Sequence, residues 1–422
     1  MVRRHFLVGG AVLVLCASCS GGGKRAAVSS TTAAARSTTS TTIASATVAQ
    51  LAAGRWSTIP AGPLAPRLSS SVVFTGDELV VWGGIATPSG KPENDGAAYN
   101  PTTRSWRMLP PSPLTPREGA AAIWTGSEIV FWGGIYPEPP GRVTRPSVEA
   151  VTYTPATNTW RTIGVAPLAP ANFPMGVWTG DRVVIFSGEG AASYDPATNR
   201  WERLPAPTLP THLPGWQVKR YGWQFAAVAG HGRLLAWSAW DAQKHIAPNG
   251  LEGTAGSDLF RYDEASNRWT ALAPGPDAIA APAYAFWNRG RLLVIGTAAR
   301  PSGSQGPAQG EMTASYDSRT GRATRAPSSA VDQRMWSVWT GDAIWSLGYA
   351  ASGRLGATSA YDPATNLSRD LKATPFAFQQ ESAPVPIWTG TSVLVWFSAR
   401  VYPPEPKTIG GLEYILGSHR AT

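Results

Sequence analysis

The sequence predicts an all-β fold, a β-propeller of seven blades with four antiparallel strands in each blade. The first observation behind this prediction is a pattern that recurs seven times along the 422 residues, with successive copies 49 to 58 residues apart. Repeats of about 40 to 50 residues that contain four strand-forming segments are typical of propellers. The second observation is the composition, with 44 Gly, 37 Pro, 19 Trp and only 15% charged residues. Chains rich in turns and aromatic residues favour all-β architectures.

The first half of each repeat has the chemistry of a β-hairpin. Residues 72–74 and 79–82 are runs of Val, Phe, Leu and Trp, which form strands readily. Between them, Thr75-Gly76-Asp77 suits a tight turn, because glycine accepts positive φ angles. The equivalent turns are centred on Gly76, Gly126, Gly180, Gly232, Gly290, Gly341 and Gly390.

The second half of each repeat is a tyrosine, a turn and a tryptophan, which predicts a third and a fourth strand. Four copies are complete, and they cover residues 99–106, 153–160, 194–201 and 262–269. Tyr316 and Tyr361 keep the tyrosine and the turn, whereas Tyr414 keeps the tyrosine alone. Because the tryptophans recur at one position per repeat, we interpret them as packing between blades rather than as platforms for sugars. This set is Trp56, Trp106, Trp160, Trp201 and Trp269.

The last repeat, which ends near Tyr414, has no room for a fourth strand with a tryptophan. The first repeat is preceded by residues 54–60, whose Gly-Arg-Trp-Ser-Thr-Ile-Pro pattern is like the Asn-Arg-Trp-Glu-Arg-Leu-Pro pattern of residues 199–205. We therefore predict that the N-terminal strand lies beside the strand ending at Tyr414 and completes the last blade. Such closure joins both ends of the ring and removes free sheet edges.

These repeats resemble kelch repeats. The resemblance covers about residues 52–416 and implies that residues 51–422 form one kelch-type β-propeller. It is strong in the first three repeats and weaker in the later ones. The residues that carry it are the Pro-Arg pairs before the first strands, the Gly pairs after the second strands, the tyrosines and the tryptophans: Pro66-Arg67, Pro116-Arg117, Gly83-Gly84, Gly133-Gly134, Tyr99 and Trp106.

The resemblance also raises the question of a cofactor. Galactose oxidase has a kelch-type propeller, and its copper chemistry uses a tyrosine cross-linked to a cysteine. The only cysteines of this chain are Cys16 and Cys19, so that copper centre cannot form in the predicted propeller. The histidines show no metal-binding motif or paired spacing. We therefore expect no cofactor and no metal.

The first 18 residues have the pattern of a secretory signal peptide: basic residues, a short apolar run and small residues before Cys19. Small residues followed by a cysteine resemble the bacterial lipoprotein signal, which implies lipidation of Cys19; plain cleavage without a lipid is the alternative. Residues 19–50 are rich in Ser, Thr and Ala, so we expect a flexible tether. The expected localisation is the outer face of the bacterial cytoplasmic membrane, with the lipid in the bilayer, or secretion if no lipid is added.

The formal net charge is +9, but the basic residues are scattered and form no run longer than a pair. Nucleic-acid binding requires a clustered basic footprint, so we expect no nucleic-acid partner. We expect a monomer whose partner is a protein or a glycan.

The function of a propeller usually lies in its loops rather than in its repeated positions. The resemblance to kelch propellers implies that the connections between blades and those between second and third strands share one face. Residues 204–224 and 238–257, predicted to form such connections, vary most between repeats and combine aromatic with charged residues, which is typical of binding surfaces. A long loop packed on itself is the alternative interpretation. The candidate binding residues here are Trp216, Lys219, Arg220, Tyr221, Trp240, Asp241 and His245.

A second candidate set is made up of arginines that precede first strands. The resemblance to kelch domains implies that such residues can bind acidic ligands, although two of them also belong to the repeat motif and so have a structural interpretation. The set is Arg67, Arg117, Arg220 and Arg334.

Two functions remain open from the sequence. The first is a binding or scaffolding module for a protein or glycan partner, displayed outside the cytoplasm. The alternative is a carbohydrate-active enzyme, a glycosidase or a lyase, that uses loop carboxylates such as Asp241 and Glu252.

Overall fold

The computed structural model describes residues 45–86, 89–136, 145–170, 173–188, 190–207, 217–228, 233–246, 250–272, 279–288, 291–298, 311–317, 322–325, 333–349, 355–375, 384–396 and 410–417. Within these residues the chain forms 33 β-strands and one short helix, α1 (Val48–Ala52). The prediction of an all-β fold is confirmed.

The longer strands pair into four-stranded antiparallel sheets, of which the described residues contain seven. We number them in chain order. Sheet 1 contains β3 (Ser71–Phe74), β4 (Leu79–Trp82), β7 (Gly96–Asn100) and β8 (Ser105–Met108). Sheet 2 contains β9 (Ala121–Trp124), β10 (Ile129–Trp132), β13 (Ala150–Thr154) and β14 (Thr159–Ile163). Sheet 3 contains β15 (Met175–Trp178), β16 (Val183–Ser187), β17 (Gly190–Asp195) and β18 (Arg200–Arg203).

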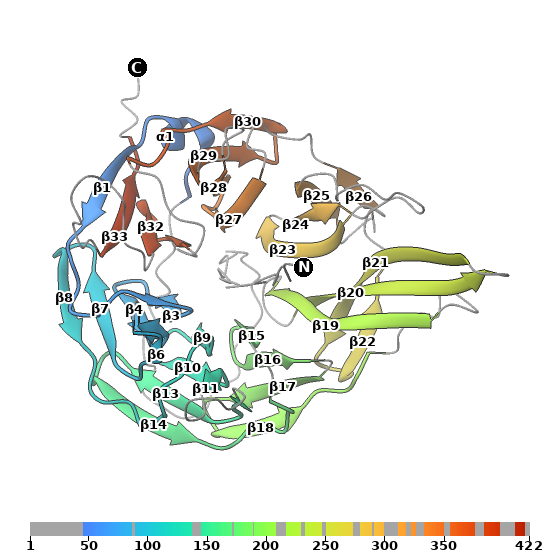
Figure 1. Cartoon of the computed structure of the whole chain (residues 1–422), viewed down its shortest axis with the longest axis horizontal. Helices are drawn as coiled ribbons and strands as arrows, with labels where there is room; N and C mark the ends of the chain where they lie inside the picture. The colour runs from blue at the N-terminus through green and yellow to red at the C-terminus, as the bar shows by residue number, and fades with distance from the viewer. Residues whose placement is uncertain are drawn as a thin grey trace, which may run out of the picture.

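The remaining sheets follow the same order. Sheet 4 contains β19 (Gln217–Val228), β20 (Arg233–Ile246), β21 (Gly250–Asp263) and β22 (Arg268–Ala271). Sheet 5 contains β23 (Ile279–Asn288), β24 (Arg291–Ala298), β25 (Glu311–Asp317) and β26 (Arg322–Arg325). Sheet 6 contains β27 (Gln333–Trp339), β28 (Ile344–Tyr349), β29 (Leu355–Asp362) and β30 (Leu367–Asp370). Sheet 7 contains β31 (Val385–Trp388), β32 (Ser392–Trp396), β33 (Gly411–Ile415) and β1 (Arg55–Ile59). Figure 1 shows the sheets set around a common centre.

Two small sheets lie at one end of sheets 1 and 2. The first contains β2 (Arg67–Leu68), β5 (Ile85–Ala86) and β6 (Lys91–Pro92). The second contains β11 (Ile135–Tyr136) and β12 (Arg145–Pro146). They form where the chain enters a sheet and where it passes from the second to the third strand.

A threonine before each turn glycine closes the first hairpin of five sheets. In sheet 1, the hydroxyl of Thr75 accepts a hydrogen bond from the Glu78 amide at 3.0 Å and donates one to the Glu78 carbonyl at 3.2 Å. The glycine that follows takes a φ angle of 101° in this sheet, where a side chain is strained. The same Thr-Gly turn recurs at Thr125, Thr179, Thr340 and Thr389.

The second hairpin is held by a tyrosine and an asparagine five residues apart. In sheet 2, the Tyr153 hydroxyl donates to Oδ1 of Asn158 at 2.7 Å, and Asn158 has a φ of 55°, a conformation that asparagine tolerates better than most residues. The same bond joins Tyr194 to Asn199, Tyr262 to Asn267 and Tyr361 to Asn366.

The repeated tryptophans connect neighbouring sheets, as the sequence predicts. The indole of Trp160 in sheet 2 lies against the Tyr153 ring, and its Nε1 donates to the carbonyl of Pro110 at the end of sheet 1, at 2.9 Å. Trp106 and Trp269 donate in the same way to Pro60 and Pro205. Trp201 is the exception among the described residues: Gly164 stands at the proline position, and the buried Nε1 has no hydrogen-bond partner.

The first described strand completes the last sheet. Strand β1 pairs with β33 in antiparallel register, with Arg55 opposite Ile415 and Ile59 opposite Gly411. The indole of Trp56 packs on Tyr414, with ring centroids 4.9 Å apart, and on Trp345 of sheet 6, at 6.1 Å. The predicted pairing of the N-terminal strand with the strand ending at Tyr414 is therefore confirmed.

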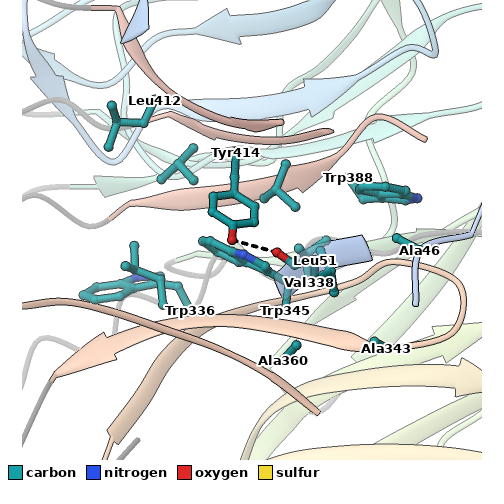
Figure 2. Packing of buried hydrophobic residues seen from close by; sticks show 13 residues of the cluster. Ala46, Leu51, Trp336, Val338, Ala343, Trp345, Ala360, Trp388, Leu412 and Tyr414 are labelled. Carbon is teal, nitrogen blue, oxygen red and sulfur yellow. Dashed lines mark hydrogen bonds between the residues drawn. The ribbon is translucent and has the colours of Figure 1, made fainter. Parts of the chain in front are cut away.

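The packed body begins before residue 51, where the sequence places the end of the tether. Ala46 is fully buried, and its amide donates to the Thr340 carbonyl at 2.8 Å. Thr47 caps helix α1 through a reciprocal pair of hydrogen bonds with Gln50. The Tyr414 hydroxyl donates to the Leu51 carbonyl at 2.7 Å (Figure 2). Residues 45–50 thus take part in the packing between sheets 6 and 7, which composition alone did not indicate.

Truncation of the N-terminal end tests this arrangement. A chain that begins at Ser45 should unfold at the same temperature as the full chain, because the packed segment is kept. A chain that begins at Ala61 lacks β1, so the edge of β33 is unpaired and the Trp56 ring no longer packs on Tyr414. We expect a loss of about 3 kcal/mol or more, the usual effect of deleting a packed aromatic side chain. Thermal denaturation measures the difference, and equal midpoints would contradict the role of β1.

Candidate functional site

The connections into sheets 1 and 2 meet the second-to-third-strand connections at one end of these sheets. Strand β2 precedes sheet 1 and pairs with β5, which follows the second strand of that sheet. In the next sheet, Glu118 forms a bridge with Ile135 at the equivalent place. We call this end the connection face and define it by residues 67–70, 83–86, 91–95, 117–119, 133–136 and 145–149. The expectation that both kinds of connection share one face holds for these two sheets.

The glycines of the pair Gly83-Gly84 are in close contact with the connections that enter sheets 1 and 2. Gly83 and Gly84 have φ angles of 66° and 99°. The Gly84 amide donates to the Arg117 carbonyl at 2.8 Å, and a Cβ on Gly83 would lie 2.8 Å from that same oxygen. A side chain at Gly83 would therefore displace the connection that leads into sheet 2. A side chain at Gly84 would displace the connection into sheet 1, because its Cβ would lie 2.6 Å from the Leu68 carbonyl oxygen.

Arg67 and Arg117 are buried and each holds a carboxylate on the connection face. The Arg67 side chain is 1% exposed and donates to Asp95 at 2.5 and 3.3 Å and to the Gly83 carbonyl at 3.3 Å. The Arg117 side chain is fully buried and donates to Glu149 and, at 3.0 Å, to the Gly133 carbonyl. The structure therefore places both arginines inside the body.

The carboxylates, not the guanidinium groups, reach the solvent. The side chains of Asp95 and Glu149 are 40% and 55% exposed. A ligand that approaches this face meets these acidic groups before the arginines. The sequence contained a signal for them, since each acidic residue directly precedes the third strand of its sheet.

Glu118 adds a half-buried carboxyl to the same face. Burial raises the pKa of Glu118, and a hydrogen bond from Ser69 lowers it by less. A carboxyl in this state takes up a proton more readily than an exposed one, so it can serve as a proton donor or as a pH-sensitive contact.

The candidate residues of sheet 4 lie in strands and not in loops. Strands β19, β20 and β21 have 12, 14 and 14 residues, whereas the strands of sheet 3 have four to six. The fourth strand, β22, pairs only with Phe260–Asp263. The rest of β21 and the facing parts of β19 and β20 form an arm, defined by residues 217–220, 237–246 and 250–259, which projects from the ring in Figure 1.

This outcome corrects the prediction of connections at residues 204–224 and 238–257. Variation between repeats and a mixture of aromatic and charged residues suggested loops, but residues 250–259 all pair with β20 inside the arm. Pairing with a neighbouring strand, which a single segment cannot reveal, decides between a loop and a strand here.

The register shows which candidate residues the arm brings together. Lys219 lies opposite Asp241, and Arg220 lies opposite Trp240. His245 lies opposite Leu251, near the tip of the hairpin. Tyr221 falls at an irregularity of β19, which shifts the register after Arg220. Trp216 and Cys19 lie outside the described residues.

The register separates the two carboxylates that the enzyme hypothesis invokes. Glu252 lies opposite Lys244, and Asp241 is three positions away from Lys244 along β20. Successive positions of a strand alternate between the faces of a sheet, so an odd offset places Asp241 and Glu252 on opposite faces. Arg334, in β27 of sheet 6, shares no sheet with the other candidates.

Two further features of the described residues concern metal binding and membrane insertion. They contain no group of three or more His, Cys, Asp or Glu side chains that could hold a metal ion. No helix among them is long and apolar enough to cross a membrane.

Comparison with known proteins agrees with the geometry of the sheets. The family described as Kelch motif matches residues 66–113, which run from the connection before sheet 1 to the connection after it. A fungal alcohol oxidase of the AA5 family, solved in complex with copper, is 12% identical, with a TM-score of 0.53 over 86% of this chain and 76% of the oxidase chain. The fold is that of a kelch-type β-propeller. The structure of YjhT is 14% identical, with a TM-score of 0.44 over 75% of this chain and all of that one.

No curated protein sequence matches the chain. The copper of the fungal oxidase has no counterpart in the donor set found here, because the described residues lack a suitable ligand cluster and the two cysteines, Cys16 and Cys19, lie outside them. The propeller fold is shared, and the described residues do not fit a copper centre.

The raised pKa of Glu118 predicts a pH dependence of stability. Because the folded protein holds this proton more tightly than the unfolded chain, the contribution of Glu118 falls as the pH rises from the ordinary carboxyl pKa through the folded value. We expect Glu118→Gln to be more stable than the unaltered protein at about pH 7 and to lose this advantage near pH 4. Urea denaturation at both pH values measures the effect. Asp77→Asn, an exposed carboxyl of the first turn, is the control, and the same pH dependence in both variants would contradict the assignment.

Proposed function

We propose that the protein is a binding module: a closed ring of seven kelch-type blades that holds a protein or glycan partner with its arm and its connection face. The observation that carries this proposal is the length of the strands in sheet 4. Leu234, Ala236 and Phe260 of these strands join the hydrophobic cluster shared with sheet 3, and β23 of sheet 5 lies against the other side of sheet 4. The arm extends beyond Leu234, Ala236 and Phe260, and the corresponding strands of sheet 3 have no such extension.

The arm and the connection face lie at the same end of the ring. In an antiparallel sheet of four strands, the connection into the first strand and the turn between the second and third strands share one end. The arm extends this turn of sheet 4, between Ile246 and Gly250, and projects outward from the ring (Figure 1), so its base lies at the same end of the ring as Asp95 and Glu149. Arg67 and Arg117 support this surface by holding the two carboxylates.

The composition of the arm favours recognition. Lys219 and Asp241 are a cross-strand pair of opposite charge, and Arg220 is opposite Trp240. Arginine and tryptophan are enriched among residues that dominate binding energies. Strand register fixes their spacing, and a fixed spacing lowers the entropy lost when a partner binds.

Display outside the cytoplasm completes the proposal. Residues 1–18 act as an export signal, Cys19 carries a lipid in the outer leaflet of the cytoplasmic membrane, and the residues between Cys19 and Ser45 tether the ring to it. The support is the order of basic, apolar and small residues before Cys19. Without the lipid, the same protein is secreted.

Replacement of the lipidated residue tests the anchoring. Cys19→Ala should abolish incorporation of labelled palmitate and should leave the protein uncleaved or released from the membrane fraction. Cys16→Leu is the matched control, because it removes the other cysteine and places there the leucine that is usual at this position of the lipoprotein signal. Unchanged labelling and fractionation in Cys19→Ala would exclude lipidation at this residue.

Alanine substitution in the arm tests the binding function. Lys219, Arg220 and Trp240 are replaced together, and binding is measured on a glycan array and on purified envelope polymers. We expect binding to fall about tenfold or more, the usual effect of removing interface anchors, with an unchanged melting temperature. The triple control replaces exposed residues of other sheets, Met108, Arg200 and Leu367. A large fall in melting temperature would show that the arm residues are structural, and release of sugars from a polymer would favour the enzyme alternative.

A further inference from the structure

The end of the ring opposite the connection face repeats one ionic arrangement between neighbouring sheets. Between sheets 1 and 2, the guanidinium of Arg107 donates to both oxygens of Glu78, at 2.9 and 2.6 Å. Its third nitrogen donates to the Tyr153 hydroxyl and to Oδ1 of Asn158, each at 2.9 Å. The guanidinium thus fills the space between the two sheets and satisfies acceptors on both.

The next junction repeats this arrangement. Between sheets 2 and 3, Arg161 donates to Glu128 at 3.1 and 3.3 Å, to Asn199 at 3.1 Å and to the Tyr194 hydroxyl at 3.4 Å. Between sheets 7 and 1, Arg104 stands at the asparagine position and donates to Glu413 at 3.1 Å and to the Thr58 carbonyl at 2.7 Å, while the buried Tyr99 hydroxyl has no hydrogen-bond partner among the described residues. A guanidinium from the chain therefore occupies this space at three junctions.

The junction between sheets 3 and 4 reverses the charges. Arg182 stands at the strand position of Glu78 and Glu128, and Glu202 stands at the position of Arg107 and Arg161. Nε of Arg182 donates to Glu264 at 3.1 Å, whereas its Nη1 is 4.0 Å from Glu202. This junction therefore holds one guanidinium against two carboxylates.

The acceptors of the next sheet remain in place at this junction. The Tyr262 hydroxyl donates to Oδ1 of Asn267 at 2.7 Å, as Tyr153 does to Asn158. Among the described residues, no guanidinium donates to either group, in contrast to Arg107 at the first junction.

A cavity of about 150 Å³ lies at this junction, beside the Arg182 guanidinium and in front of the two acceptors to which it does not donate. Its apolar lining includes Val184 and Leu204. Its charged lining is Arg182, Glu202 and Glu264, two carboxylates against one guanidinium, and so has a net negative charge. This volume corresponds to several water molecules and is sufficient for a planar guanidinium group. Glu202 is 64% exposed, so the cavity opens to solvent.

The charges around Tyr262, at the junction of sheets 3 and 4, are more acidic than those around Tyr153, at the junction of sheets 1 and 2. Burial raises the pKa of Tyr262, the nearby charges of Glu264 and Glu202 raise it further, and the charge of Arg182 lowers it by less than either. Burial also raises the pKa of Tyr153, but the Arg107 hydrogen bond lowers it. The potential at Tyr262 is therefore more negative, which favours a cation.

We propose that this cavity binds the guanidinium group of an arginine side chain from a peptide or protein partner. Glu202 accepts from the guanidinium as Glu78 does from Arg107, and Tyr262 and Asn267 accept the remaining donors. Planar, forked donors suit this set of acceptors better than a lysine ammonium does. The site lies at the opposite end of the ring from the arm, so it is independent of the proposed function above.

Calorimetric titration with short peptides tests the proposal. The probe is acetyl-Gly-Arg-Gly-amide, and the comparison peptides carry citrulline or lysine in place of arginine. We expect binding of one arginine peptide per chain and binding about tenfold or more weaker with citrulline, which lacks the charge. Free L-arginine should bind less well than the peptide, because its carboxylate faces the acidic rim.

A double substitution tests whether the chain's own guanidinium can occupy the cavity. In R182E/E202R the chain regains the arrangement of Glu78 and Arg107, so its own guanidinium should fill the cavity and binding of the arginine peptide should be lost. The melting temperature should not fall, because a favourable junction is restored. Glu202→Gln should weaken binding without filling the cavity, and Asp370→Asn, an exposed carboxyl on sheet 6, should leave it unchanged.

Three results would overturn the proposal. The first is equal binding of the arginine and citrulline peptides, which would show that charge is not recognised. The second is undiminished binding by R182E/E202R at an unchanged melting temperature. The third is equal loss of binding in Asp370→Asn and Glu202→Gln, which would indicate attraction by net charge and not a site.

Discussion

The tie between the outer strand of one sheet and the next sheet is the interaction on which the rest of the ring depends. A four-stranded sheet has two apolar faces and cannot bury both alone, so each must pack on its neighbours. Here the indole of Trp160 covers the Tyr153 ring and donates to the Pro110 carbonyl of the sheet before it. The bond satisfies a polar group at the edge of an apolar contact and fixes the distance between sheets. These contacts set the spacing between sheets and therefore the positions of the connection face and of the cavity.

Two ends of the same ring are built by different means. At the connection face, buried arginines organise the backbone: Arg117 bonds the Gly133 carbonyl and leaves Glu149 exposed. At the opposite end, partly exposed arginines such as Arg107 join side chains across a junction. Buried arginines are costly to remove because their carbonyl partners lose hydrogen bonds, so they suit a scaffold. Exposed ion pairs stabilise little, so a junction can exchange its charges and acquire a cavity without loss of the fold.

Much of the fold followed from local chemistry in the sequence. Thr75-Gly76 predicted a tight turn because glycine accepts the positive φ, and Tyr153 with Trp160 predicted the outer hairpin. The missing fourth strand near Tyr414 and the spare strand around Trp56 predicted their pairing, because an unpaired edge is unfavourable. The packing of residues 45–50 was not evident from the sequence, because small residues such as Ala46 carry no hydrophobic pattern. Ala46 is nevertheless fully buried between sheets 6 and 7.

The sequence by itself determined the repeat, the hairpins and the residues that each sheet presents at its edges, since these depend on near neighbours along the chain. Only the tertiary structure decided which candidate residues act together. It buried Arg67 and Arg117, which a motif could not distinguish from exposed arginines. It placed Lys219 and Asp241 opposite each other on paired strands, where variation between repeats had suggested loops. The cavity beside Glu202 also depends on the tertiary structure. The charges of Arg182 and Glu202 are reversed relative to the other junctions, and their effect appears only where Arg182 meets Glu264 of the next sheet.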